Sequence, residues 1–125
     1  MKTFLTTSAL ILAGLTASVA FAAPVAEMDS SIGPVLVGEN GMTLYTFKKD
    51  KENVSNCNGG CAQKWPPLMA ADDATASNGY TVIKRKDGTH QWAKGGMPLY
   101  FWVKDTKAGD VTGDGVKGVW DAARP

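Results

Sequence analysis

The sequence predicts a small, mainly β single domain built from two pseudo-symmetric units, each a β-hairpin followed by a loop. The first observation behind this prediction is a repeat at an offset of 55 residues, in which 8 of the 25 positions from Gly41 to Trp65 recur. Composition alone would give about one or two such identities. The second is that both copies place a Leu-Tyr-x-aromatic stretch after a glycine turn, and the third is a weak helix signal throughout.

Residues 1–22 have the pattern of a cleaved secretory signal peptide. Met1-Lys2 carries an early positive charge, an apolar run follows, and Ala20-Phe21-Ala22 fits the small-x-small cleavage rule. The apolar run is shorter than the ~20 residues of a bilayer span, which disfavours a retained membrane anchor. We therefore expect a periplasmic or secreted protein, in a compartment where disulfides persist.

The rest of the chain predicts one domain with a short lead-in. Residues 23–34 contain few large apolar side chains and are expected to be flexible. Residues 35–125 are expected to form the domain, with repeats at residues 35–68 and 90–123. Residues 23–125 hold 12 basic and 12 acidic side chains, so we expect no nucleic-acid partner, and they hold no apolar stretch that would span a membrane.

The expected strands come from β-branched and aromatic runs bounded by turn residues. In the first copy, an Asn40-Gly41 turn links two such runs, and Lys94-Gly95-Gly96 has the same place in the second copy. One helical turn is expected over residues 62–64, before Pro66-Pro67 ends it. The expected strands are residues 34–38, 43–48, 80–85, 91–93 and 99–103.

The residues that the two copies share are predicted to be structural framework. The aromatic members favour a buried core between the copies, although they could also line a ligand groove or relay electrons. The two aspartates are expected to cap loops, and a catalytic carboxylate pair is the alternative. The framework set is Tyr45, Phe47, Asp50, Trp65, Tyr100, Trp102, Asp105 and Trp120.

The two cysteines, Cys57 and Cys61, predict a disulfide that pins a glycine-rich turn. The alternative is a Cu(I) site, because soft thiolates suit that ion and thioethers could complete the ligand set. His90 is the only histidine, and a Cys-x-x-Cys-His haem motif is absent. The methionines that this alternative would use are Met42, Met69 and Met97.

The second loop resembles a calcium-binding loop in its spacing. Oxygen-bearing side chains occupy positions 1, 3, 5 and 12 of residues 110–121, and Gly115 occupies position 6. Against this, position 12 is an aspartate, position 9 is Gly118, and no flanking helix is evident, so plain turn chemistry is the other interpretation. The predicted calcium ligands are Asp110, Thr112, Asp114 and Asp121.

Several spaced motifs together resemble a known bacterial family. They are Leu-Tyr-x-Phe-x-x-Asp, Ser-x-Cys-x-Gly-x-Cys-Ala-x-x-Trp-Pro-Pro, Asp-Gly-x-x-Gln and Gly-x-Pro-Leu-Tyr. Their order is similar to that of the bacterial "secreted repeat of unknown function" proteins, predicted lipoproteins with a Tyr-x-(Phe/Trp/Tyr)-x-x-Asp motif. The resemblance implies export and a repeat architecture, but no activity. This chain departs from many relatives in that no cysteine follows its apolar run.

For function, we expect an exported, non-enzymatic binding or interaction module of the cell envelope. A metal-binding or electron-transfer accessory protein is the first alternative. An enzyme is disfavoured, because no nucleophile–base pair is visible in the sequence. No cofactor is expected beyond a possible calcium or copper ion, and the expected partner is an unidentified envelope protein or small ligand.

Overall fold

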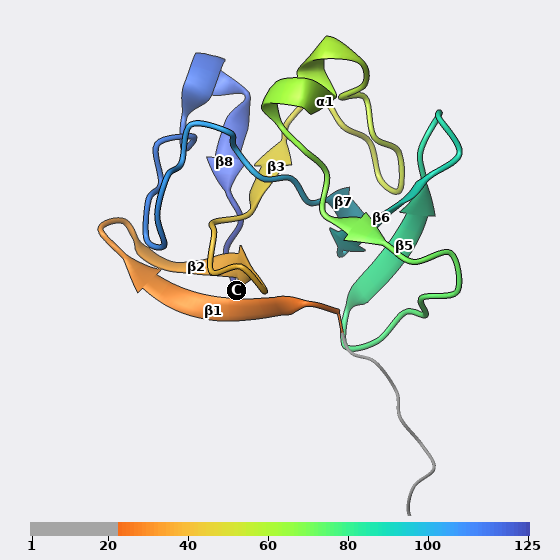
Figure 1. Cartoon of the computed structure of the whole chain (residues 1–125), viewed down its shortest axis with the longest axis horizontal. Helices are drawn as coiled ribbons and strands as arrows, with labels where there is room; N and C mark the ends of the chain where they lie inside the picture. Colours follow the sequence, from red (N-terminus) through yellow and green to blue (C-terminus); the bar gives the residue numbers. More distant parts are fainter. Residues whose placement is uncertain (1–22) are drawn as a thin grey trace, which may run out of the picture.

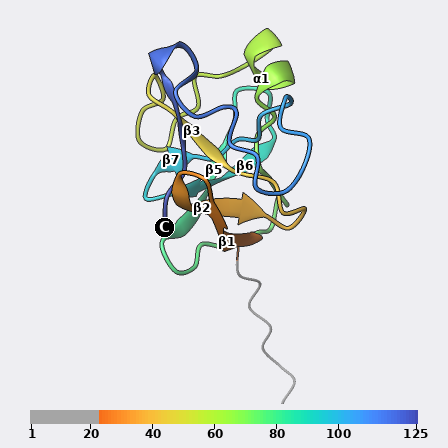
Figure 2. The same cartoon turned by 90° about the vertical axis from the view of Figure 1, so that its left-hand side faces the viewer.

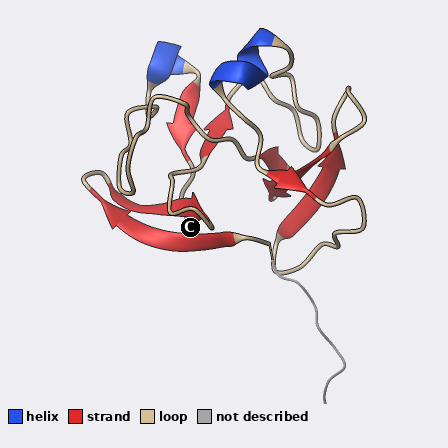
Figure 3. Ribbon diagram, viewed as in Figure 1, coloured by secondary structure: helices blue, strands red, loops and turns tan. Residues whose placement is uncertain are grey.

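The computed structural model describes residues 23–125, so the predicted signal peptide at residues 1–22 lies outside the described part. It confirms a mainly β fold of small sheets (Figures 1 and 3). The helical pieces are α1 (Gly60–Lys64) and a 3-10 turn (Val116–Gly118). The strands are β1 (Val25–Ser30), β2 (Gly33–Gly38), β3 (Tyr45–Phe47), β4 (Met69–Ala70), β5 (Tyr80–Lys84), β6 (His90–Lys94), β7 (Met97–Pro98) and β8 (Trp120–Ala122).

The repeat begins earlier in the chain than the sequence predicted. The expectation of a flexible lead-in at residues 23–34 is wrong, because β1 pairs along its whole length with β2. This β1–β2 hairpin matches the β5–β6 hairpin of the second copy, which is likewise antiparallel. Three of the six residues of β1 are exposed, namely Ala26, Glu27 and Asp29, and the other three are partly buried. The missing apolar residues therefore reflect a half-exposed edge strand and not an unstructured segment.

Each repeat completes the sheet of the other. The N–H of Leu36 donates to the carbonyl of Ala123 (2.9 Å), and the N–H of Ala123 donates to the carbonyl of Leu44 (2.8 Å). The second copy has the same arrangement, in which Leu68 lies between Trp92 and Leu99 with hydrogen bonds of 2.9 Å on both sides. The last segment of each copy is thus a strand-like insert between two segments of its partner copy.

A pseudo-twofold axis passes between two equivalent residues, Tyr45 and Tyr100. The backbone N–H of Tyr45 donates to the carbonyl of Tyr100 (2.8 Å), and the N–H of Tyr100 returns a bond of 3.0 Å. On one side of the axis, β3 pairs with β8. On the other side, Pro67 makes only an isolated bridge with Tyr100. Proline lacks an N–H, so residues 66–67 cannot form the full ladder that β8 forms.

Two apolar clusters fill the interior. The first contains the shared aromatic framework with Val35, Val37 and Cys57. The second is largely aliphatic around Trp92 and Leu99, and includes Ala23. The helical turns lie at one end of the molecule and the β1–β2 hairpin at the other (Figure 2). Because the aromatic cluster takes rings from both copies, neither copy has a complete core by itself.

Candidate functional site

Four aromatic rings form a continuous stack across the pseudo-twofold axis. Trp65 and Trp120 stack at its centre, with ring centroids 3.7 Å apart and planes 3° from parallel. Phe47 continues the stack from Trp120 at 4.2 Å, and Trp102 continues it from Trp65 at 3.9 Å. Equivalent residues therefore occupy equivalent places on the two sides of the axis, and the stack joins the two repeats.

The tyrosines of this cluster meet the aspartates of the opposite copy. The Tyr45 hydroxyl donates to Asp105 Oδ2 (2.5 Å), and the Tyr100 hydroxyl donates to Asp50 Oδ2 (2.7 Å). The rings of Tyr45 and Trp65 are close to perpendicular, with their centroids 5.4 Å apart and their planes at 77°. We call these two crossed hydrogen bonds the tyrosine–aspartate clasp. The shared Tyr-x-aromatic-x-x-Asp motif thus makes its contact between copies and not within one.

Burial shapes the acid–base properties of the clasp. It raises the pKa of Asp50 above the usual value, against the lowering effects of the Asn56 N–H, the Tyr100 hydroxyl and the positive charge of Arg85. Burial also raises the pKa of both clasp tyrosines far above the usual value. A buried phenol therefore remains protonated at any physiological pH, because its anion would lose hydration.

Arg85 is a buried residue that the sequence interpretation missed. Its side chain donates to Gln91 Oε1 (2.7 Å), to the carbonyl of Cys57 (2.8 Å) and to Ser55 Oγ (3.0 Å). Ser55 in turn lies 2.6 Å from the Tyr100 hydroxyl. A Lys-Arg-Lys run normally indicates a solvent-exposed face, so the sequence around Arg85 did not indicate that this side chain is buried. The nearby Asp-Gly-x-x-Gln motif, which contains Gln91, was the only indication.

The predicted disulfide between Cys57 and Cys61 is present, with their Cα atoms 5.2 Å apart. Both sulfurs are bonded to each other, so neither can serve as the thiolate that the copper hypothesis requires. Among the other proposed copper ligands, Met69 is half exposed. His90 Nδ1 lies 3.0 Å from a carboxylate oxygen of Asp72.

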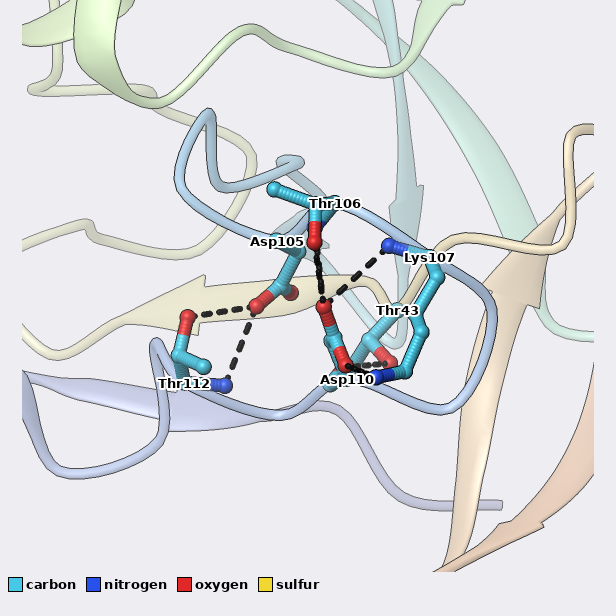
Figure 4. A network of polar contacts seen from close by, with 6 residues as sticks. All are labelled: Thr43, Asp105, Thr106, Lys107, Asp110 and Thr112. Atoms are coloured by element: carbon cyan, nitrogen blue, oxygen red, sulfur yellow. Dashed lines mark hydrogen bonds and ion pairs between the residues drawn. The ribbon is translucent and has the colours of Figure 1, made fainter.

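Three of the four predicted calcium ligands lie in the second loop and Asp121 lies in β8, and each of the four has its own partners. Asp110 Oδ2 accepts hydrogen bonds from the N–H groups of Thr106 and Lys107, which hold the pKa of Asp110 below its usual value (Figure 4). Thr112 bonds Asp105, in the same view. Asp114 accepts from the N–H of Ala122, and Asp121 pairs with Lys48.

These separate contacts are those of a folded turn. In the described part of the chain, no group of three or more acidic, histidine or cysteine side chains is placed to hold a metal ion. The structure therefore does not bring the four predicted calcium ligands together. Asp110 instead ties the loop to the first copy, because its carbonyl accepts from the Thr43 hydroxyl (2.7 Å).

A surface groove of about 380 Å³ lies at the seam between the two repeats. Its first wall comes from the beginning of β1 and from Leu36, and its second comes from Tyr80, Asn78 and Lys94 of the other copy. A smaller hollow of about 190 Å³ shares Val25 and Ala26 with it. No helix within residues 23–125 is long and apolar enough to cross a membrane.

Comparison with known proteins confirms the family resemblance. The family described as "secreted repeat of unknown function" matches the chain twice, at residues 27–69 and 81–124. These matches begin in β1 and near the start of β5, as the structural repeat does, and not at the predicted residues 35 and 90. No curated protein and no solved structure matches the chain significantly. The chain belongs to the family of secreted repeats of unknown function.

Proposed function

We propose that this exported protein is a non-enzymatic binding module of the cell envelope, and that the groove between its two repeats is the ligand site. The observation that carries the proposal is the composition of that groove, to which both copies contribute. Ligand sites favour such seams, because they offer concave apolar surface with a few polar groups. The polar groups of the tyrosine–aspartate clasp, by contrast, are buried and bonded to one another.

The groove suits a short, extended and amphipathic ligand. Val25 and Ala26 supply apolar surface, and the two adjoining hollows run along the start of β1. Glu27 and Lys94 bring charges of opposite sign to its rim. The Glu27 carboxylate adds to the effect of burial in raising the pKa of Tyr80. A short peptide carrying a cationic group matches this arrangement, because its ammonium group would face Glu27.

Charge reversal at the groove tests this proposal. The probe is a set of fluorescent tetrapeptides of mixed charge and hydropathy, measured by fluorescence polarisation and by backbone NMR shifts. Glu27→Lys should weaken binding of cationic peptides by about tenfold, equivalent to about 1.4 kcal/mol. Asp29→Lys is the matched control, because Asp29 lies on the same strand but outside the groove lining. It should bind cationic peptides as the wild type does.

Two results would overturn the groove as the ligand site. The first is a set of NMR shifts that map away from Val25, Leu36 and Tyr80. The second is equal binding by the Glu27→Lys and Asp29→Lys proteins. Absence of binding by every peptide in the set would reject the peptide ligand class.

Electron transfer is the second candidate function, and the four-ring stack is the observation that favours it. Stacked indoles at 3.7–3.9 Å provide close electronic contact between the copies. A metal-binding role has no comparable support within residues 23–125.

A further inference from the structure

We propose that the aromatic stack and the tyrosine–aspartate clasp form a relay for one-electron oxidation. In this relay, an oxidising equivalent enters at Trp102, passes to Trp65, and settles on Tyr45 as that residue's phenolic proton moves to Asp105. The relay is independent of the seam groove, since none of these four residues lines it. The relay would let the protein give up single electrons to a diffusible one-electron oxidant in the cell envelope.

The path begins at the accessible end of the stack. Trp102 is partly exposed, whereas Trp65 and Trp120 are 4% and 3% exposed. A small oxidant in solution therefore reaches Trp102 first. Trp102 lies 3.9 Å from Trp65 between ring centroids, and Trp65 lies 3.7 Å from Trp120. Lys104 Nζ lies 6.0 Å from the Trp102 ring centroid, and its positive charge disfavours a cationic radical at that position.

The terminal step balances in electrons and protons. Trp102 first loses one electron to a one-electron oxidant, which is reduced, and the vacancy moves to Trp65 as an indole radical cation. Tyr45 then gives one electron to Trp65, its O–H bond breaks, and the proton passes to Asp105 Oδ2 along the existing hydrogen bond of 2.5 Å. The products are a neutral indole, a neutral tyrosyl radical and a protonated carboxyl.

A positioned base makes this step possible in a buried site. An oxidised phenol is a very strong acid, so a tyrosine that has no base nearby cannot lose its proton in the interior. Asp105 is 7% exposed and faces the Tyr45 hydroxyl directly. The centroids of the Tyr45 and Trp65 rings are 5.4 Å apart, which gives the electron a short path between them. Electron donor and proton acceptor are therefore both in place before any oxidation occurs.

The surroundings of the two tyrosines determine which one receives the vacancy. Tyr100 has the equivalent partners, Trp120 and Asp50. Its hydroxyl, however, also contacts Ser55, which accepts a hydrogen bond from the buried cation of Arg85. That positive charge opposes an electron vacancy on Tyr100. Tyr45 contacts the Gly113 N–H instead, at 3.2 Å, and is the preferred terminus.

Flash generation of azidyl radicals, followed by time-resolved absorption and electron paramagnetic resonance, tests the relay in the intact exported protein. In the wild type, a tryptophanyl radical should appear first and convert to a tyrosyl radical. Tyr45→Phe should remove most of the tyrosyl signal. Asp105→Asn keeps a hydrogen-bond acceptor but removes the base, so it should slow the conversion on the order of a hundredfold.

Trp92 provides the matched control, because it is 4% exposed like Trp65 but lies in the other core cluster, outside the stack. Trp92→Phe should leave the conversion unchanged, whereas Trp102→Phe should lower the tyrosyl yield. Near-ultraviolet circular dichroism reports whether each variant keeps its stack. A further measurement needs only the wild type. Because a proton moves when Tyr45 is oxidised, the tryptophanyl radical should convert to the tyrosyl radical more slowly in D₂O than in H₂O.

Three results would overturn the relay. One is unchanged conversion in a folded Asp105→Asn protein, and another is the absence of a solvent isotope effect in the wild type. The third is a terminal radical on Tyr80 instead of on Tyr45.

Discussion

At the scale of single residues, the role of the shared motif follows from the side chains that its tyrosine and aspartate contact. Tyr45 and Asp50 are five positions apart in one copy, yet each bonds a residue of the other copy. The sequence interpretation of Asp50 and Asp105 as loop caps has a counterpart in the structure, because Asp50 Oδ1 also accepts the N–H of Asn56 (2.6 Å). Each carboxylate therefore serves a loop and a phenol at once.

Gly113 is the residue whose enlargement should disturb the clasp most directly. A Cβ there would lie 2.8 Å from the Tyr45 ring and 3.0 Å from Trp65. Gly113→Ala should lower the free energy of unfolding by about 1–3 kcal/mol, the usual cost of overpacking. Gly60→Ala is the control, since Gly60 lies in α1 with open space around it. Urea titration of both variants measures the effect, and equal stability would contradict the prediction.

Asp50 should make a pH-dependent contribution to stability. Its folded-state pKa is raised above the usual 3.8, so the contribution is complete below that value and is lost as pH rises through the raised pKa. Asp50→Asn stays neutral at every pH. The stability of the wild type minus that of Asp50→Asn should therefore fall as pH rises from 3.8. Urea titrations over a pH series measure this difference, and a rising difference would refute the assignment.

At the scale of elements, the two loops that follow the shared strands are held in place by different interactions. The first is closed by the Cys57–Cys61 disulfide, and Arg85 binds the carbonyl of Cys57. The second is held by side-chain oxygens, with Asp110 and Asp105 accepting backbone N–H groups. Spacing alone suggested calcium for the second loop, because ligand loops and turns use the same residues. Only the hydrogen bonds separate the two.

Removal of the disulfide should cost modest stability. The bridge closes a loop of only a few residues, for which the chain-entropy relation gives about 2 kcal/mol. The Cys57→Ala/Cys61→Ala protein should fold with its free energy of unfolding lowered by about that amount. Thermal and urea unfolding measure the change, with reductant-treated wild type as the comparison. Loss of folding, or no loss of stability, would contradict a local role for this bridge.

Element positions were partly predictable from the sequence. The strand at residues 80–85 and the short helix before Pro66-Pro67 came close to β5 and α1. The expected hairpin partner of residues 43–48 was wrong for most of that strand, because β3 pairs with β8. Turn residues predict pairing between strands that are adjacent in the sequence. They contain no information on pairing with a strand 75 positions away.

At the scale of the whole molecule, the exchange of terminal segments makes the two repeats interdependent. Residues 23–74 and 75–125, prepared separately, should each be unfolded, because Leu68 and Ala123 are inserted into the opposite half. Mixing the halves should restore the β signal and the stacked-indole signal in circular dichroism. Cleavage within the exposed part of residues 71–79 interrupts no strand. A half that folds alone would disprove the interdependence.

The sequence by itself determined the repeat, its framework residues, the disulfide and the family, because these depend on residue identity and spacing. Tertiary structure alone decided that the copies exchange segments and that each tyrosine bonds the other copy's aspartate. It also decided that Arg85 is buried and that the predicted calcium ligands have separate partners. The physical reason is that a pseudo-twofold arrangement pairs equivalent residues across an axis. Its contacts join positions that are far apart in the chain, and local sequence patterns do not predict such contacts.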